Sequence, residues 1–313
     1  MTGRKESQFD NPFPTIIDAC QSGTMAEKMA APLPFPRMLD VELTNVCNMR
    51  CQMCPVGCRL QTRPVGYMTI GTLHSILREA KKYRTPIRFI RWGEPLLHYG
   101  WAFAIRSVVD AGLACHLNTN GLILTDLDSF GGRNRKQLIN SGLTSLKISF
   151  QGTDPNTYQL WRGKNLYAAL MEALKDLRRL RGGRRTPVLQ VGTTITTESE
   201  LLVRTFREEV APFAEACYVG HTVDMTATEE VPVYGQCPEV FDKLSVNWNG
   251  IITPCCSDWN EFMNLGRVPE TSLKQAWNSK ALRAIREDFL AGQFDRYRPC
   301  RNCPRFPRAR RTP

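Results

Sequence analysis

Apolar residues along this chain alternate between two patterns, one typical of buried strands and one typical of amphipathic helices. Short β-prone runs predict strands at residues 38–43, 87–91, 114–118, 145–150, 188–195 and 215–219. Helical spacing between them predicts helices near residues 70–82, 101–112, 134–141, 164–181 and 199–210. Six strand–helix units in succession predict an α/β fold, with a parallel sheet and helices outside it.

The two ends of the chain do not follow this alternation of strand and helix patterns. Residues 1–36 are expected to be an N-terminal extension, with one helix near Ile16–Met29 and a proline-rich linker at residues 31–36. Residues 37–225 are expected to form the core, and residues 226–313 a small cysteine-rich domain. In that domain we expect a hairpin at residues 244–253, turning at Asn249-Gly250, and a helix at residues 272–290.

Composition narrows the class of protein. The 313 residues contain no apolar run near the roughly 20 residues that span a bilayer, and the first residues lack a signal peptide's apolar region. We therefore expect a cytoplasmic protein with no membrane contact. In that compartment twelve cysteines indicate metal or redox chemistry rather than disulfides. Basic patches at residues 178–185 and 305–311 contribute to the net charge of +11, but we interpret them as a solvated helix end and a frayed terminus and give a nucleic-acid partner little weight.

The strongest chemical signal is a loop after the first predicted strand. Cys47, Cys51 and Cys54 have the spacing C-x3-C-x2-C and supply three thiolates. A four-iron cluster held by three thiolates keeps one iron open for a small molecule. A zinc knuckle is the alternative, and it would need a fourth ligand such as Cys58. The next predicted strand ends in Gly93-Glu94-Pro95. This tripeptide is a common turn and is uninformative alone, but its position one strand after the cysteine loop makes it a candidate part of the same site.

Together these two motifs resemble the radical S-adenosylmethionine (radical SAM) superfamily. The resemblance implies a partial (β/α)6 TIM-like barrel whose chemistry lies at the carboxyl ends of the strands. It also implies a SAM-binding [4Fe-4S] cluster on Cys47, Cys51 and Cys54, which cleaves SAM to a 5′-deoxyadenosyl radical. The resemblance assigns SAM contacts to Gly93, Glu94, Pro95, Asn118, Ser149, Arg162, Gly192 and Thr194. The alternatives are a tight turn for Asn118, a surface arginine for Arg162 and a β-bulge at Gly192.

A second cysteine set lies near the C-terminus. Cys237, Cys255, Cys300 and Cys303 can ligate one auxiliary [4Fe-4S] cluster completely, and a structural zinc is the alternative. The segment resembles the SPASM/twitch extension of radical SAM enzymes. Ala309 stands where a full SPASM pattern has another cysteine, so the resemblance implies the twitch form with one auxiliary cluster.

The resemblance leaves the reaction open. We favour oxidation of a small molecule, a sugar or aminocyclitol alcohol, with flavodoxin or ferredoxin as electron donor; a peptide is the other substrate class. The alternative is a radical epimerase in which Cys256 returns a hydrogen atom. His221 is the candidate for substrate contact. A zinc-stabilised RNA- or protein-binding module is the alternative of another class, although it would not explain Gly93-Glu94-Pro95 or the six units.

Overall fold

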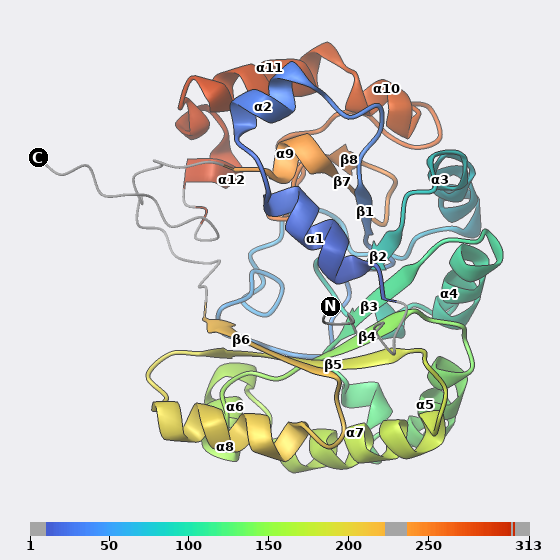
Figure 1. The fold of residues 1–313 in the computed structure, drawn as a ribbon, viewed down its shortest axis with the longest axis vertical. Coiled ribbons are helices and arrows are strands. Elements are labelled where there is room, and N and C mark those ends of the chain that lie inside the picture. The colour runs from blue at the N-terminus through green and yellow to red at the C-terminus, as the bar shows by residue number, and fades with distance from the viewer. Residues whose placement is uncertain (1–10, 223–236, 302, 304–313) are drawn as a thin grey trace, which may run out of the picture.

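The computed structural model describes residues 11–222, 237–301 and 303. The six expected strands form one parallel series, in which each strand pairs with the next. They are β1 (Met38–Val41), β2 (Ile87–Phe89), β3 (Cys115–Thr119), β4 (Ser145–Ser149), β5 (Val188–Ile195) and β6 (Ala216–His221). Helices cover the outside of the curved sheet (Figure 1), namely α3 (Ile70–Tyr83), α4 (Trp101–Asp110), α5 (Gly131–Ile139), α6 (Pro155–Arg162), α7 (Tyr167–Arg181) and α8 (Glu200–Val210). The predicted partial barrel is confirmed.

The cysteine-rich segment continues the same sheet. Strand β7 (Lys243–Val246) pairs with β1 in parallel, and β8 (Ile252–Thr253) pairs with β7 in the antiparallel direction. The predicted hairpin turn is present, with Gly250 at φ +85°. The C-terminal segment is therefore attached to the barrel edge by backbone hydrogen bonds. The boundary expected at residues 225–226 lies outside the described residues.

Two of the expected helices are broken by capping residues. The helix expected near Ile16–Met29 is α1 (Phe13–Gln21) followed by α2 (Met25–Ala30), because Thr24 caps a new helix with its side chain. The helix expected at residues 272–290 is α10 (Leu273–Trp277) followed by α11 (Lys280–Leu290), and Ser279 caps the second. Hydrophobic spacing carries across such breaks, so it does not detect them.

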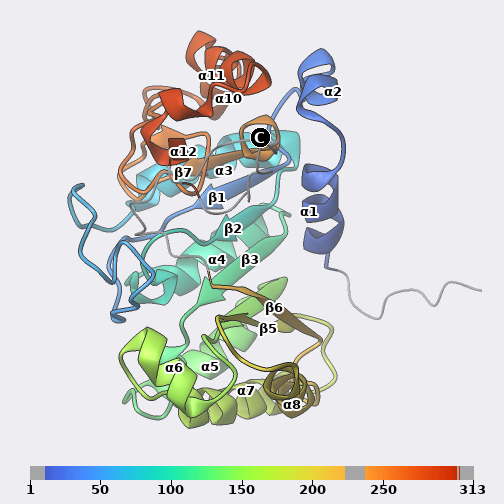
Figure 2. The same cartoon turned by 90° about the vertical axis from the view of Figure 1, so that its left-hand side faces the viewer.

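The remaining elements are short. They are η1 (Pro95–Leu97), η2 (Leu122–Leu124), α9 (Glu239–Asp242), η3 (Phe294–Arg296) and α12 (Arg298–Arg301). Among the described residues, no helix combines the length and the apolar character needed to cross a membrane. In Figure 2 the helices α10 and α11 lie at one end of the molecule, on the same side as β7.

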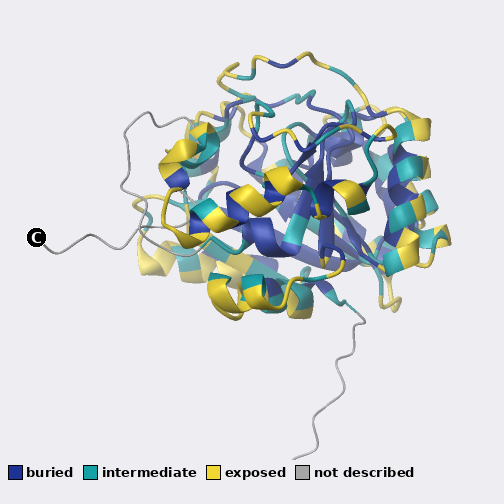
Figure 3. Cartoon of the chain, turned by 90° about the horizontal axis from the view of Figure 1, so that it is seen from above, coloured by how far each residue is buried: buried dark blue, intermediate teal, exposed yellow. Residues whose placement is uncertain are grey.

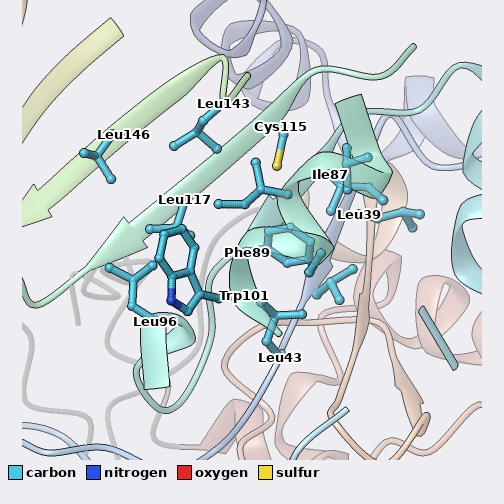
Figure 4. Close-up of a cluster of buried hydrophobic side chains, with 14 of the residues drawn as sticks. Leu39, Leu43, Ile87, Phe89, Leu96, Trp101, Cys115, Leu117, Leu143 and Leu146 are labelled. Carbon is cyan, nitrogen blue, oxygen red and sulfur yellow. The ribbon is translucent and has the colours of Figure 1, made fainter. Parts of the chain in front are cut away.

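The apolar side chains of the strands face the outer helices. Figure 4 shows Leu39, Ile87, Phe89 and Leu117 in one cluster that also includes Trp101 of α4, and all five are buried. Seen from above and coloured by burial, the central strands are mostly dark blue and the helices present their exposed residues outward (Figure 3). Burial of these side chains is the main favourable term in folding.

Polar side chains at alternate strand positions face the barrel interior. Arg88 Nε donates to Asp40 Oδ1 at 2.7 Å, and His116 Nδ1 lies 2.7 Å from Ser145 Oγ. Burial, followed by the charges of Arg88 and Lys147, lowers the pKa of His116 to about 3. The interior of this barrel is therefore a charged, hydrogen-bonded layer rather than a second apolar core.

Candidate active site

The loop with Cys47, Cys51 and Cys54 follows β1 and folds tightly on itself. Cys54 N donates to Cys51 O at 3.2 Å, and a side chain at Gly57 would place its Cβ 2.2 Å from Cys51 O. The three sulfurs do not all lie within 4.8 Å of one another, as judged from the described residues. A tetrahedral zinc would hold sulfurs about 3.8 Å apart, given its Zn–S bonds of about 2.3 Å. Three thiolates from one loop are the ligand set that a four-iron cluster with one open iron needs.

Arg162 connects this loop to the end of β4. Its Nη1 donates to Cys51 Sγ at 3.3 Å and its Nη2 to Ser149 O at 2.7 Å. Its Nε is buried and has no hydrogen-bond partner within the described part of the chain. A buried donor without an acceptor is costly, so this guanidinium fits a site that receives a further anionic or carbonyl group. The residues present thus fit a cluster with a carboxylate-bearing ligand beside it.

The Gly93-Glu94-Pro95 turn is locked against the cysteine loop. Gly93 has φ +108°, and a Cβ there would lie 2.3 Å from Thr44 O, so only glycine fits. Glu94 N donates to Val46 O at 2.7 Å, one residue before Cys47. Pro95 then opens η1. The two sequence motifs are therefore one structural unit.

The Glu94 carboxylate is directed into the protein. It accepts hydrogen bonds from Thr119 Oγ1 and from the backbone N–H of Asn120, both at 2.7 Å, and from Leu96 N at 3.1 Å. Burial raises the pKa of this carboxyl to about 7. Asn120 in turn donates to Asn48 Oδ1 at 2.8 Å. Glu94 thus orders the turn after β3 as well as its own, and its contact to SAM stays a prediction.

The second cysteine set comes together from three separate segments. Cys237 precedes α9, Cys255 follows β8, and Cys300 and Cys303 lie in and after α12. Burial raises the pKa of the Cys237 thiol, and the neighbouring Cys300 and Cys303 raise it further. The pKa of Cys255 is also raised, first by its hydrogen bond with Cys256 and then by burial, with Cys237 among the nearby charges. The four predicted ligands are neighbours, as an auxiliary cluster would require.

Glu239 is a neighbour of this set that the sequence analysis did not identify. One ligand atom each from Glu239, Cys255 and Cys256 lie within 4.8 Å of one another. Cys256 Sγ is 4.0 Å from Glu239 Oε2, and Lys243 forms an ion pair with the same carboxylate. The only sequence signal was an acidic residue two positions after Cys237.

Arg91 and Trp92 join the two cysteine regions, and the sequence analysis gave no role to either. Arg91 Nη1 donates to Cys255 O at 3.0 Å and Nη2 to Asp258 O at 3.1 Å. Trp92 Nε1 donates to Cys256 O at 3.0 Å. Arg91 holds φ +104°, which is strained for a residue with a Cβ. The strand that carries the Gly93 turn therefore also fixes the loop of Cys255 and Cys256.

A cavity of about 390 Å³ lies between these parts. It is lined by Met53 of the cysteine loop, by residues at the carboxyl ends of the barrel strands and by the auxiliary loop; they include Ile90, Arg91, Trp92, Asn118, Gln151, Thr194, His221, Cys256 and Ser257. Asn118, Thr194, His221 and Cys256 were expected in the site from the sequence, and the structure brings all four to one cavity.

The other expected residues lie around this cavity rather than in its lining. Ser149 holds Arg162 through its carbonyl, and Gly192 pairs with Ser149 in the sheet. A Cβ on Gly192 would lie 3.1 Å from Lys147 Cδ, so the glycine makes room for that side chain. Cys58 is exposed and its thiol donates to Gln52 O at 2.9 Å. Ala309 lies outside the described residues.

Comparison with known proteins agrees with this geometry. The radical SAM superfamily matches residues 41–204, and the SPASM family, described as an iron–sulfur cluster-binding domain, matches residues 237–304. The AdoMet-dependent heme synthase of Methanosarcina barkeri is 28% identical over 57% of this chain and 48% of its own length. A GTP 3′,8-cyclase of Synechococcus elongatus is 27% identical over 51% and 46%. The chain spans about half the length of the curated relatives it matches.

Solved structures share the fold. BtrN in complex with AdoMet and 2-DOIA superposes with a TM-score of 0.58 at 16% identity, covering 86% of this chain and 92% of BtrN. Streptococcus suis SuiB bound to its precursor peptide SuiA gives a TM-score of 0.61 at 15% identity, over 91% and 74%. The protein uses a SAM-binding [4Fe-4S] cluster and an auxiliary iron–sulfur cluster, so the zinc-stabilised binding module is set aside. This chain belongs to the radical SAM superfamily and carries a C-terminal SPASM domain.

Proposed function

We propose that this enzyme oxidises a small polar molecule, a sugar or aminocyclitol alcohol, after abstracting a hydrogen atom from it. The observation that supports the proposal most directly is the cavity of about 390 Å³ bounded by Met53, the strand ends and the auxiliary loop. It lies toward the lower end of the roughly 300–1,000 Å³ range of small-molecule sites. Because the cavity is lined from both cysteine regions, a substrate in it could react with the radical formed at the first cluster and pass an electron to the auxiliary cluster.

The lining of the cavity favours hydroxyl and amino groups. Asn118, Gln151, Thr194 and His221 supply hydrogen-bond donors and acceptors, and Trp92 supplies an apolar wall. Gln151 Nε2 donates to Thr222 Oγ1 at 2.8 Å, and Thr222 donates to Thr194 Oγ1 at 3.1 Å, so these polar groups are already ordered. Order of this kind lowers the entropic cost of holding a ring in one orientation. The fold similarity to BtrN with bound 2-DOIA is consistent with this substrate class.

The chain's own residues have three tasks in the proposed reaction. When bound, SAM and its cluster supply a carbon radical that removes hydrogen, and the auxiliary cluster supplies an acceptor for the second electron. Cys47, Cys51 and Cys54 hold the first cluster, and Glu94 and Arg162 position SAM beside it. Cys237, Cys255, Cys300 and Cys303 hold the second. His221, in the cavity lining, accepts the hydroxyl proton, so the substrate loses two hydrogens in total.

A radical epimerase is the second candidate, because Cys256 lines the same cavity. A thiol there could return a hydrogen atom to the substrate radical. A peptide substrate is retained as an alternative on the fold similarity to SuiB, whose structure holds its precursor peptide. A flavodoxin or ferredoxin is proposed as the reductant in either case.

Anaerobic assays with SAM and dithionite test these candidates. Cluster-loaded protein is incubated with a panel of aminocyclitols, sugars and short peptides, in H2O and in D2O, and 5′-deoxyadenosine and products are measured by mass spectrometry. Oxidation predicts a product two hydrogens lighter than the substrate, and Cys256→Ala should keep forming it. A product of unchanged mass in H2O, carrying one carbon-bound deuterium in D2O and lost in Cys256→Ala, would overturn oxidation in favour of epimerisation.

A further inference from the structure

A second cavity, of about 290 Å³, lies between the N-terminal helices and the C-terminal helices, and its walls share no residue with the site above. Its walls come from Met29 of α2 and Pro32, and from the junction of α10 and α11, where Ser279 and Arg286 line it. We call it the Arg286 cavity. The lining segments are about 250 positions apart in the chain (29 to 279). They meet because α2, α10 and α11 lie at the same end of the molecule (Figure 2).

Arg286 is buried, and it forms no ion pair with the residues that the structure describes. The residue is only 8% exposed. Its Nε donates to Val240 O at 2.9 Å, and its Nη2 is buried with no hydrogen-bond partner among the described residues. The guanidinium carbon lies 4.2 Å from the ring centroid of Trp277, a cation–π contact that orients it but accepts no hydrogen bond. No carboxylate of the described residues lies within 4.0 Å of it.

Other buried arginines of this protein have a carboxylate partner, which Arg286 lacks among the described residues. Arg63, Arg135 and Arg181 are equally buried, and each forms an ion pair with a carboxylate, at 2.5, 2.6 and 2.6 Å respectively. Asp242 is the acid whose charge acts on Arg286, and it already pairs with Lys28 and Arg37. Burial lowers the pKa of Arg286 to about 10, against the partial opposing effect of Asp242. An uncompensated buried charge of this kind is expensive unless a partner completes it.

Two further features of the cavity favour an anion. Arg283, one helical turn before Arg286, lines it, and so does Ser279, the N-cap of the eleven-residue helix α11. The first turn of a helix directs backbone N–H groups and the positive end of its dipole outward. Glu287 also lines the cavity and opposes an anion; like Arg283 it is exposed, where solvent and salt screen its charge, whereas Arg286 is buried.

We propose that the Arg286 cavity binds a phosphate group, either as free phosphate or as the phosphate of a small monoester, through Arg286, Arg283 and the first turn of α11. Arg286 lines the cavity, a planar guanidinium can match two phosphate oxygens, and the cavity volume accommodates a phosphate with a short substituent. Because the walls come from both ends of the chain, the ligand stabilises their mutual packing.

Calorimetry on the cluster-loaded protein tests the proposal. Inorganic phosphate and glycerol phosphate are titrated separately at constant ionic strength, with chloride as reference. Saturable binding is expected, together with a rise in melting temperature. Tighter binding of glycerol phosphate identifies a monoester as the source, and equal or tighter binding of inorganic phosphate identifies the free anion.

Variants show where binding occurs. Arg286→Lys keeps the positive charge but loses the paired N–H donors of the guanidinium. This variant should bind phosphate about tenfold more weakly, which is the effect of losing one charge-assisted hydrogen bond. If that variant does not fold, Arg283→Gln, at an exposed position, should also weaken binding several-fold. Arg185→Gln, exposed after α7, is the matched control and should bind like wild type. No saturable phosphate binding, or binding unchanged in both Arg286→Lys and Arg283→Gln, would overturn the proposal.

Discussion

The guanidinium of Arg91 donates to the backbone carbonyl of Cys255 at 3.0 Å. Arg91 lies two residues before Gly93, at the turn that locks onto the SAM-cluster loop, while Cys255 is a proposed ligand of the auxiliary cluster. The segment from Arg91 to Glu94 thus contacts both cysteine regions, which are about 200 residues apart in the chain (47 to 255): the Arg91 side chain bonds the Cys255 loop, and Glu94 N bonds Val46 O. Any disturbance of one region can reach the other through this contact.

Replacement of Arg91 should therefore disturb the auxiliary cluster as well as the fold. In Arg91→Met both guanidinium hydrogen bonds are lost, and we expect a lower free energy of unfolding by about 2 kcal/mol. We also expect a changed electron paramagnetic resonance signal of the reduced auxiliary cluster, because its ligand loop is no longer held. Arg106→Met, which removes an exposed hydrogen bond to Asn140 O, is the control. An unaltered auxiliary signal in Arg91→Met would contradict the coupling.

The second prediction concerns the cluster that cleaves SAM. Replacing Cys47, Cys51 and Cys54 together with Ala should abolish 5′-deoxyadenosine formation under strong reductant, since these three thiolates are the proposed ligands of the cluster that cleaves SAM. The auxiliary cluster should remain. Cys217→Ala, at a half-buried thiol in β6, should retain SAM cleavage. If the triple variant still cleaves SAM, the assignment of these three ligands is wrong.

The third prediction concerns the auxiliary site. Replacing Cys237, Cys255, Cys300 and Cys303 should reduce the iron content of anaerobically reconstituted protein by about half, because each site holds about four irons. Cys58→Ala should leave iron unchanged, as its thiol donates to Gln52 O. Elemental analysis showing constant iron with loss of zinc would instead establish a structural zinc in the C-terminal segment.

The fourth prediction follows from His116. Its pKa is lowered to about 3 by burial and by the charges of Arg88 and Lys147, whereas an unfolded histidine titrates near 6.5. Between these values the unfolded state binds the additional proton, so stability is fully present above about pH 6.5 and falls as the pH falls. From pH 6.5 to pH 5 this costs about 2 kcal/mol.

Substitution of this histidine should remove that pH dependence. His116→Gln is expected to lose less stability than wild type between pH 7 and pH 5, measured by anaerobic urea unfolding. His74→Gln, at an exposed histidine of α3, should keep the wild-type dependence. Parallel pH profiles for His116→Gln and wild type would argue that another group carries the effect.

Several features could be predicted from the sequence because they depend on local spacing. The alternation of strand and helix patterns predicted six βα units, and Asn249-Gly250 predicted the hairpin. The C-x3-C-x2-C loop and Gly93-Glu94-Pro95 were recognisable because each lies within a few consecutive residues. By contrast, the breaks at Thr24 and Ser279 were missed, since one capping hydroxyl outweighs a continuous hydrophobic pattern there.

The amino-acid sequence by itself determined the fold class, the positions of the three loop thiolates and the family, because these are set by periodicity and by short motifs. Only the tertiary structure decided which distant residues meet. The attachment of β7 to β1, the Arg91 contact with Cys255, Glu239 beside Cys256 and the burial of Arg286 without a carboxylate partner among the described residues all depend on segments far apart in the chain. Hydrogen bonding and charge compensation act between neighbours in space, so no spacing along the sequence records them.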